Sequence, residues 1–430
     1  MFSQSERAEI IALMKREIIP AIGCTEPVAV ALCVARATEE LGSLPESIAV
    51  RLSGNMLKNA MGVGIPATGM TGLPVAVALG AAIGRSEYGL EVLRDTTPEA
   101  VERAKTYMGE NRIDIGLKQD TDEKLYIEVE VTHGADIATV VIAGEHTRFV
   151  QISRNGVASL DNNAGNGNYA FDDSAAVELS LSRVWDFAMT APLDEIDFIL
   201  EARRLNMAAA ETSLAGSYGH RLGRIVGAED KRQLLGDGIF TRMLSCTSAA
   251  CDARMAGAMI PVMSNSGSGN QGIAATVPVA VYAEACNADE EHIVRALTLS
   301  HLTVIYIKQL LGRLSALCGC VVAATGSSCG ITYLMGGGYN EVSYAVKNMI
   351  ANLTGMICDG AKPSCALKLS SGVSTAMLSA VLAMEHECVS SVEGIIDDDV
   401  DRCIRNLATI SRDGMNETDR LILQIMTNKC

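Results

Sequence analysis

Two kinds of hydrophobic pattern divide this chain of 430 residues. Near the N-terminus, apolar residues recur every three to four positions in residues 5–19 and 26–41, a spacing that predicts two amphipathic helices. Between residues 125 and 160, the segments YIEVEV, ATVVIA and TRFVQIS instead alternate apolar and polar residues and are separated by turn-forming sequences. This period of two predicts a small antiparallel sheet.

Shorter patterns complete the region around the predicted sheet. Residues 47–52 (SIAVRL) predict a further strand, and residues 73–83 and 98–108 predict helices. After a Gly- and Asn-rich connector at residues 161–168, helical patterns continue from about residue 175 to the end of the chain. The predicted fold class is therefore α+β, a predominantly helical catalytic domain with an inserted small α/β unit that contains an antiparallel sheet.

We expect three parts along the chain. Residues 1–42 form N-terminal helices that pack on the catalytic domain, residues 43–165 form the α+β domain, and residues 166–430 form the helical catalytic domain. The sheet unit is thus inserted in sequence between two helical regions that pack on each other. That packing would bring Cys24 close to the cysteines of the second half.

Charge and composition exclude several kinds of partner. The formal net charge is −16 at pH 7, and such a field repels nucleic acid and anionic membrane surfaces, so neither is expected as a partner. Residues 59–84, 255–283 and 314–340 carry no charge, but glycine, proline or serine clusters interrupt them, which favours buried segments over membrane spans. The N-terminus has no signal-peptide pattern, and 13 cysteines in so long a chain indicate reduced thiols and a cytoplasmic location.

Four cysteines have surroundings that indicate chemistry. Cys24 lies in the sequence GCTEP, directly before a predicted helix, where free N–H groups and the helix dipole favour a thiolate that serves as base or nucleophile. A buried structural thiol is the alternative. Cys318, Cys358 and Cys365 have spacings that fit neither a zinc ribbon nor a compact ferredoxin motif. Cluster ligands from separated segments and plain core thiols are equally compatible with those spacings.

The sequence leaves the roles of two more thiols open and suggests a structural role for one histidine. Cys320 follows Cys318 so closely that spacing does not exclude it as the ligand in place of Cys318. Cys430, the last residue, could cap an iron, although a frayed terminus is the simpler interpretation. None of the six histidines has metal-ligand spacing, and His301, in an apolar helix, is expected to be a satisfied core residue.

Two polar segments are candidates for holding a small ligand. Residues 264–272 (SNSGSGNQG) contain G-x-G-x-x-G, but no convincing strand precedes it, so NAD is not expected. We interpret this loop as a nest of backbone amides for a carboxylate, with an ordinary Gly-rich turn as the alternative. Asn55, Lys58 and Asn59 follow a predicted strand and could grip an amino acid, or else form a solvated loop.

The motifs GCTEPVAVAL, SGNMLKNA, SGSGNQGI, CGC and MICDGAKPSCALK, in this order, resemble the L-cysteine desulfidase family, which is related to the iron–sulfur L-serine dehydratase alpha chain. The resemblance extends from about residue 10 to beyond residue 380. It implies a [4Fe–4S] cluster held by Cys318, Cys358 and Cys365, and Cys24 as the catalytic base. The implied reaction converts L-cysteine to pyruvate, ammonia and sulfide without pyridoxal phosphate.

This chemistry fits the residue types. β-Elimination needs a base for the Cα proton and a Lewis acid that polarises the leaving group. The expected partner is a small amino acid, and a homodimer is an open option. The residues expected to bind the substrate are Asn55, Lys58, Asn59, Ser266, Gly269, Asn270 and Gln271.

Three alternatives remain at the level of sequence. An L-serine or L-threonine dehydratase would use the same site with a different leaving group. A non-catalytic redox or metal-binding protein would use the same thiols without turnover. A dinucleotide-dependent oxidoreductase rests only on the GSGNQG sequence. Nothing in these residues determines which β-substituent is preferred.

Overall fold

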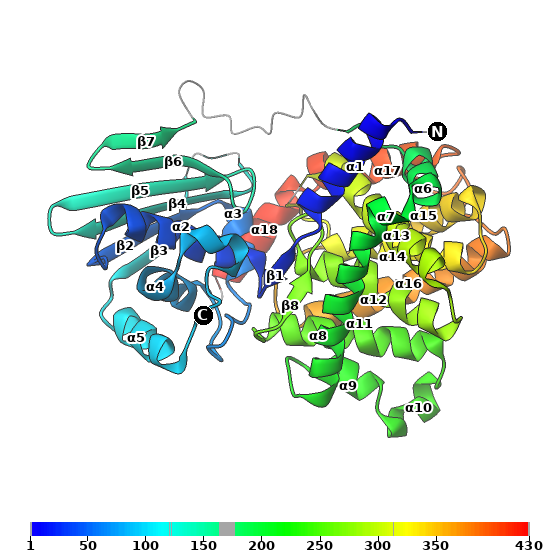
Figure 1. The fold of residues 1–430 in the computed structure, drawn as a ribbon, viewed down its shortest axis with the longest axis horizontal. Coiled ribbons are helices and arrows are strands. Elements are labelled where there is room, and N and C mark those ends of the chain that lie inside the picture. The colour runs from blue at the N-terminus through cyan, green and yellow to red at the C-terminus, as the bar shows by residue number, and fades with distance from the viewer. Residues whose placement is uncertain (1, 120, 122, 163–176, 313, 429–430) are drawn as a thin grey trace.

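The computed structural model describes residues 2–119, 121, 123–162, 177–312 and 314–428. Cys430 therefore lies outside the described residues. Figure 1 shows a sheet-containing unit beside a larger helical body. The α+β fold class predicted from sequence is confirmed.

The sheet unit is built on six strands in the order β3-β2-β4-β5-β6-β7. All neighbours are antiparallel except β2 and β3, which are parallel, so the sheet is mixed rather than purely antiparallel. A parallel pair needs a crossover connection, and the helices between β2 and β3 supply it. In chain order the strands are β2 (Ser47–Leu52), β3 (Ile113–Leu117), β4 (Tyr126–His133), β5 (Asp136–Ala143), β6 (Phe149–Arg154) and β7 (Val157–Asp161).

Helices cover one face of this sheet. α2 (Thr25–Leu41) packs on β4, β5 and α4 (Leu73–Ile83), and α5 (Pro98–Gly109) packs on α4. Inward-facing apolar residues of β2, β4 and β5 share a core with α2. α3 (Gly54–Ala60) and η1 (Ser86–Glu91) complete the crossover.

The two N-terminal helices pack on different parts of the protein, which differs from the expectation for residues 1–42. α1 (Gln4–Glu17) contacts α13 of the helical body, whereas α2 belongs to the core of the sheet unit. α2 is buried along nearly its whole length, because it lies between the sheet and α4. The domain boundaries themselves remain a prediction.

The helical body has a core in which α12, α13 and α14 contact one another. Glycines permit the close approach: a Cβ on Gly326 of α14 would lie 2.4 Å from the carbonyl oxygen of Ser300 on α13. The elements of the body are α6 (Leu181–Thr190), α7 (Leu193–Ile196), η3 (Asp197–Ile199), α8 (Leu200–Ala215), α9 (Leu222–Val226), α10 (Glu229–Leu235), α11 (Ile239–Met255), α12 (Gly269–Ala285), α13 (Glu290–Leu311), α14 (Gly319–Leu334), α15 (Tyr339–Leu353), α16 (Cys365–Met384), α17 (Val400–Thr409) and η4 (Ile410–Gly414).

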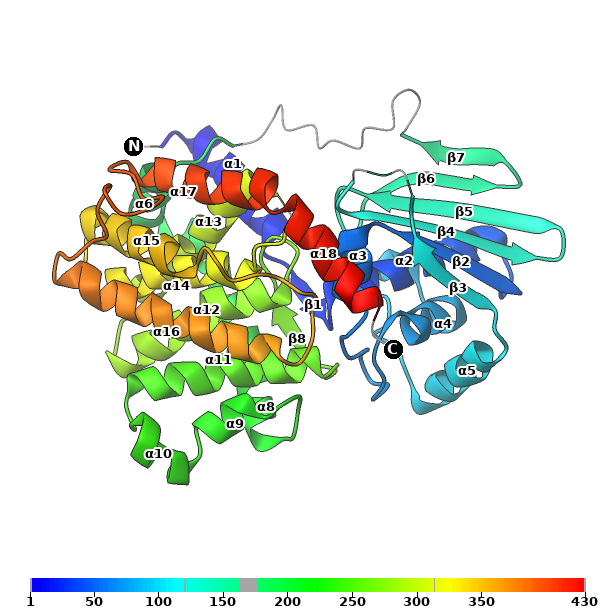
Figure 2. The same cartoon turned by 180° about the vertical axis from the view of Figure 1, so that it is seen from behind.

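Helix α18 and a short strand pair both link the body to the sheet unit. α18 (Asn416–Thr427) leaves the body and contacts α3, as seen from behind in Figure 2. β1 (Pro20–Ile22) pairs antiparallel with β8 (Pro261–Met263), a short strand that the sequence did not predict. Because β1 leads directly into Cys24, this pairing brings the start of α2 to the loop that follows β8.

One helix of the described part of the chain, α16, is long and apolar enough to cross a membrane. Half of its most apolar window is buried inside the protein, and it packs on α11, α14 and α15. Core helices of water-soluble folds pass the same length and composition test, so α16 is weak evidence for a membrane span.

Candidate functional site

The N-terminal ends of four helices meet at one small pocket. Cys24, Ser268 and Cys318 are the N-cap residues of α2, α12 and α14, and Cys365 is the first residue of α16. No side chain caps any of these four ends in the described residues. Unpaired N–H groups and aligned dipoles make such ends favourable for anions, so their convergence produces an electropositive pocket.

The pocket has a volume of about 80 Å³. This is far below the roughly 300–1,000 Å³ of sites for drug-sized ligands, and it suits a compact ligand. Its lining includes Cys24, Glu26, Asn59, Arg254, Ser268, Asn270, Gln271, Cys318, Cys320, Cys358, Cys365 and Lys368.

Backbone pairing places Cys318 beside Cys358. The N–H of Cys318 donates to the carbonyl of Met356 (2.9 Å), and the N–H of Cys358 donates to the carbonyl of Ala316 (2.6 Å). Between them, Leu317 and Ile357 form an isolated antiparallel bridge. The two cysteines are therefore held in register although they are far apart in sequence.

A tight loop leads from Cys358 to Cys365. Gly360 has φ +90°, and a Cβ at this position would lie 2.3 Å from the carbonyl oxygen of Lys58. Only glycine fits both this backbone conformation and this contact. The loop is closed by a hydrogen bond from the N–H of Cys365 to the carbonyl of Lys362 (2.9 Å).

The three thiols have different proton affinities. The neighbouring Cys320 side chain lowers the pKa of Cys318 to about 7. Burial raises the pKa of Cys358 to about 11 and also raises the pKa of Cys365. Lys368 donates to the carbonyl of Ile357 (2.9 Å) and places a positive charge at the same pocket.

The donor set fits an iron–sulfur cluster better than a single metal ion. Within the described ranges, no three His, Cys, Asp or Glu side chains gather closely enough to hold one ion. Cys318, Cys358 and Cys365 instead line the pocket from separate segments. Thiolates are the usual ligands of such clusters, each on a different iron, and the helix ends around them favour the negative charge of a thiolate-bound cluster.

Cys24 is buried, with 1% of its surface exposed, and its thiol donates to Oε2 of Glu26 (2.9 Å). Burial, and after it the charge of Glu26, raise the pKa of the Cys24 thiol well above its usual value, although Arg254 acts in the opposite direction. The sequence had indicated a thiolate stabilised by the helix end. The structure differs from that expectation, because desolvation and a neighbouring carboxylate outweigh the helix dipole.

Glu26 connects the thiol to the rest of the pocket. Its Oε2 also lies 3.0 Å from the hydroxyl of Thr25, and its Oε1 accepts a hydrogen bond from Nδ2 of Asn59 (3.2 Å). The carboxylate is thus buried with hydrogen-bond donors on both oxygens, and it accepts the hydrogen bond of the Cys24 thiol.

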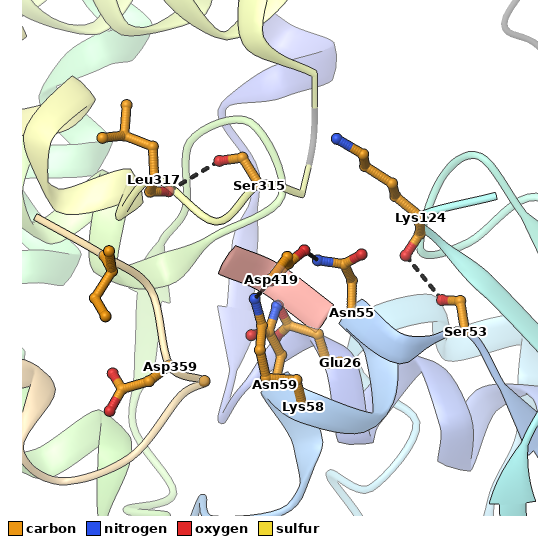
Figure 3. Close-up of polar contacts among 12 residues, drawn as sticks. Glu26, Ser53, Asn55, Lys58, Asn59, Lys124, Ser315, Leu317, Asp359 and Asp419 are labelled. Carbon is orange, nitrogen blue, oxygen red and sulfur yellow. Dashed lines mark hydrogen bonds and ion pairs between the residues drawn. The ribbon is translucent and has the colours of Figure 1, made fainter. Parts of the chain in front are cut away.

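Of the residues expected to bind substrate, Asn59, Asn270 and Gln271 line the pocket, whereas Asn55 and Lys58 do not. Both of the latter point to Asp419 of α18, as Figure 3 shows: Nδ2 of Asn55 lies 2.5 Å from Oδ2, and Nζ of Lys58 pairs with Oδ1. Their observed role is to tie α3 to the C-terminal helix.

The loop after β8 is not an open nest of amides. The N–H groups of Ser264 and Ser266 donate to Ile19 and Glu17. Those of Asn265 and Ser268 donate to each other's carbonyl groups. The prediction of a nest over residues 264–272 is therefore wrong for these four amides of its first half, and the free amides that it needs are found in the first turn of α12.

Two of the predicted ligand-binding residues have structural positions in this loop. Ser266, with φ +48°, donates its hydroxyl to Oδ1 of Asn265 (2.8 Å) and does not line the pocket. Gly269 lies against Arg254: a Cβ there would be 2.3 Å from Nε of that arginine. The absence of a side chain at Gly269 is what lets Arg254 approach.

His301 contacts the loop after β8 through its buried ring. It is fully buried, its Nδ1 accepts from Nδ2 of Asn265 (3.0 Å), and its Nε2 lies 2.9 Å from the hydroxyl of Thr276. Burial lowers the pKa of His301 to about 3, so the ring is neutral. The expectation of a satisfied core histidine is confirmed.

Sequence reasoning missed Arg254, Lys368 and the role of Glu26. Glu26 and Lys368 both occur inside quoted motifs, but neither had been given a role. Arg254 is the last charged residue before the uncharged residues 255–283 and lies on a helix that is buried almost throughout. A single cation at such a position is a detectable signal for a buried site.

Removing the carboxylate of Asp419 should destabilise the protein. The side chain of Lys58 is 1% exposed, so Asp419→Ala would leave a buried ammonium without its counter-charge. We expect the free energy of unfolding to fall by about 3 kcal/mol, measured by urea denaturation. Glu417→Ala, on the same helix but in an exposed pair with Arg420, is the matched control and should change stability by less than about 0.5 kcal/mol. Equal effects of the two substitutions would contradict this interpretation.

Comparison with known proteins identifies the family. The sequence model of the serine dehydratase alpha chain matches residues 87–424. The chain therefore belongs to the serine dehydratase alpha chain family, whose members are lyase-type enzymes, and the relation expected from the motifs is confirmed.

Similar proteins occur in several bacteria. UPF0597 protein BF3560 of Bacteroides fragilis is 65% identical over 427 residues, which is 99% of each chain. A UPF0597 protein of Phocaeicola vulgatus is 65% identical over 430 residues, all of this chain and 99% of the relative. A UPF0597 protein of Oleidesulfovibrio alaskensis is 46% identical over 429 residues, 99% of each chain. These names specify no substrate.

Proposed function

We propose that the protein catalyses β-elimination of L-cysteine to pyruvate, ammonia and sulfide. The observation that supports this most strongly is the arrangement of four thiols, Cys24, Cys318, Cys358 and Cys365, around one electropositive pocket. Membership of the serine dehydratase alpha chain family supports the reaction class. The proposal requires neither pyridoxal phosphate nor NAD, and it implies a cytoplasmic enzyme.

In this proposal, Cys318, Cys358 and Cys365 hold a [4Fe–4S] cluster. When bound, the cluster supplies a Lewis-acidic iron that polarises the leaving group. The thiol of Cys320 donates to the carbonyl of Lys368 (3.0 Å) and packs under Gly372, where a Cβ would lie 2.7 Å from Sγ. Since Cys320 is thus engaged by α16, these contacts support Cys318 as the ligand.

In this proposal, Cys24 removes the Cα proton of the substrate, and Glu26 orients the Cys24 thiol. The hydrogen bond to Oε2 of Glu26 orients the Cys24 thiol, and loss of the thiol proton leaves a thiolate at the N-terminus of α2. The thiolate then accepts the Cα proton, the C–H electrons form the Cα=Cβ bond, and the Cβ–S bond breaks to release hydrosulfide. The resulting 2-aminoacrylate becomes an imine, and water converts it to pyruvate and ammonia.

The experiment that tests the proposal is turnover after anaerobic reconstitution with iron and sulfide. We expect equal amounts of pyruvate and sulfide from L-cysteine, and less pyruvate from L-serine because hydroxide is the poorer leaving group. Faster release of pyruvate from L-serine would assign the protein as an L-serine dehydratase with the same site. A stable cluster without turnover of either amino acid would favour a redox or metal-binding role.

A further inference from the structure

Arg254 is a buried cation, and two of its three side-chain nitrogens lack a hydrogen-bond partner in the described part of the chain. Only 3% of the residue is exposed, and its Nε and Nη2 make no hydrogen bond to any of the described residues. No carboxylate of the described chain forms an ion pair with it. Burying a guanidinium without a hydrogen-bond acceptor costs free energy of folding. Stabilisation of the fold therefore does not explain why Arg254 is buried here.

The position of Arg254 indicates an anionic ligand. The side chain lines the same pocket as Cys24 and lies against the start of α12, where Gly269 makes room for it. The first N–H groups of α12 are free at this end. A fixed guanidinium beside a helix N-terminus is a strong arrangement for binding a carboxylate.

The same pocket contains unpartnered acceptors. Oδ1 of Asn59 and Oε1 of Gln271 are buried and accept no hydrogen bond from the described residues. The amide of Asn59 is oriented by its donation to Glu26, which leaves the oxygen turned away from that carboxylate. Two amide oxygens without donors, beside the negative charge of the buried Glu26 carboxylate, match an ammonium group with its N–H donors.

We propose that the pocket binds the zwitterion of a free α-amino acid, with Arg254 on the α-carboxylate and Asn59, Gln271 and Glu26 around the α-ammonium group. This deepens the proposed function, on which it rests for the identity of the ligand. It assigns Arg254 as a specificity-determining residue. N-acylated amino acids and amino-acid amides would each lose one of the two charges, peptides would carry the two charges on different residues, and all three would be rejected.

L-Alanine is a suitable probe because it carries both charged groups but no β leaving group. Titration calorimetry on the anaerobically reconstituted protein should detect binding of L-alanine, and at least about 10-fold weaker binding of propionate and of ethylamine. Arg254→Met should weaken L-alanine binding by about 10- to 100-fold. Arg254→Lys, which keeps the charge but not the planar fork, should be intermediate.

The matched control is Arg242→Met on the same helix, since Arg242 is half-exposed and pairs with Glu284 outside the pocket. It should leave L-alanine binding unchanged. Arg254→Met should keep or raise the melting temperature of the ligand-free protein, because it removes a buried unpaired charge. A merely structural arginine would instead lower the melting temperature and leave L-alanine affinity unchanged, and that result would overturn the proposal, as would failure of L-alanine to bind.

Measurements of both turnover and L-alanine binding with Arg254→Met distinguish failure of this inference from failure of the proposed function. Turnover of L-cysteine with an unchanged KM in Arg254→Met would overturn the zwitterion assignment and leave the elimination reaction standing. Arg254-dependent binding of L-alanine without turnover of L-cysteine or L-serine would support the assignment and refute the reaction.

Discussion

Replacing Cys358 by alanine is expected to abolish turnover of L-cysteine together with iron binding. Cys358 is one of the three proposed cluster ligands among the thiols that line the pocket, and the other thiol at the end of its loop, Cys365, is itself a proposed ligand. Iron content and sulfide content after anaerobic reconstitution should fall well below those of the wild type, and pyruvate formation should fall to background. Cys286→Ala, at an exposed thiol, should keep both cluster and turnover.

The same experiment tests the choice between neighbouring thiols. Cys318→Ala should behave like Cys358→Ala, whereas Cys320→Ala should retain the cluster, because the Cys320 thiol is directed at the backbone of α16. A Cys358→Ala protein with a full cluster and wild-type turnover would refute the proposed ligand set.

Replacing Cys24 by alanine is expected to lower kcat by about 10²- to 10⁴-fold while the cluster is retained, as for the loss of a general base. Cys24 is not among the proposed ligands, so iron content should match the wild type. Loss of iron together with activity in Cys24→Ala would instead indicate that Cys24 is a ligand.

The pH dependence provides a second readout for Cys24. Burial and the charge of Glu26 raise the pKa of this thiol, so the thiolate is scarce at neutral pH and becomes more abundant as pH rises. The value of kcat/KM should therefore increase towards alkaline pH, by up to about tenfold per pH unit below the pKa. Cys24→Ala should lack this increase, and a wild-type profile that falls from neutral to alkaline pH would contradict the role of the thiol as base.

The alternation of YIEVEV and ATVVIA was enough to predict β4 and β5, because side chains of period two have to divide between a core face and a polar face. The strand β3 was missed although Ile113, Ile115 and Leu117 alternate with Asp114 and Gly116, because only five residues carry the alternation and none of them is fully buried. Its parallel pairing with β2 depends on the helices that cross between them, which is a tertiary feature.

The candidate site was predictable only in part, and the reason differs between residues. Cys24, Cys318, Cys358 and Cys365 were found because thiols are few and their motifs are distinctive. Lys58 was expected to bind substrate, but whether a lysine is free or paired depends on what the fold places beside it, and here that is Asp419.

By itself, the sequence determined the α+β class, most of the helices and strands, and which thiols to examine, because periodicity and local motifs are properties of short segments. Only the tertiary structure decided that four helix N-termini meet at one pocket and that the thiol of Cys24 has a raised pKa. It also revealed Arg254, whose Nε and Nη2 are buried without a hydrogen-bond partner among the described residues. Burial, pairing and the meeting of distant helix ends depend on long-range packing, which no short stretch of sequence encodes.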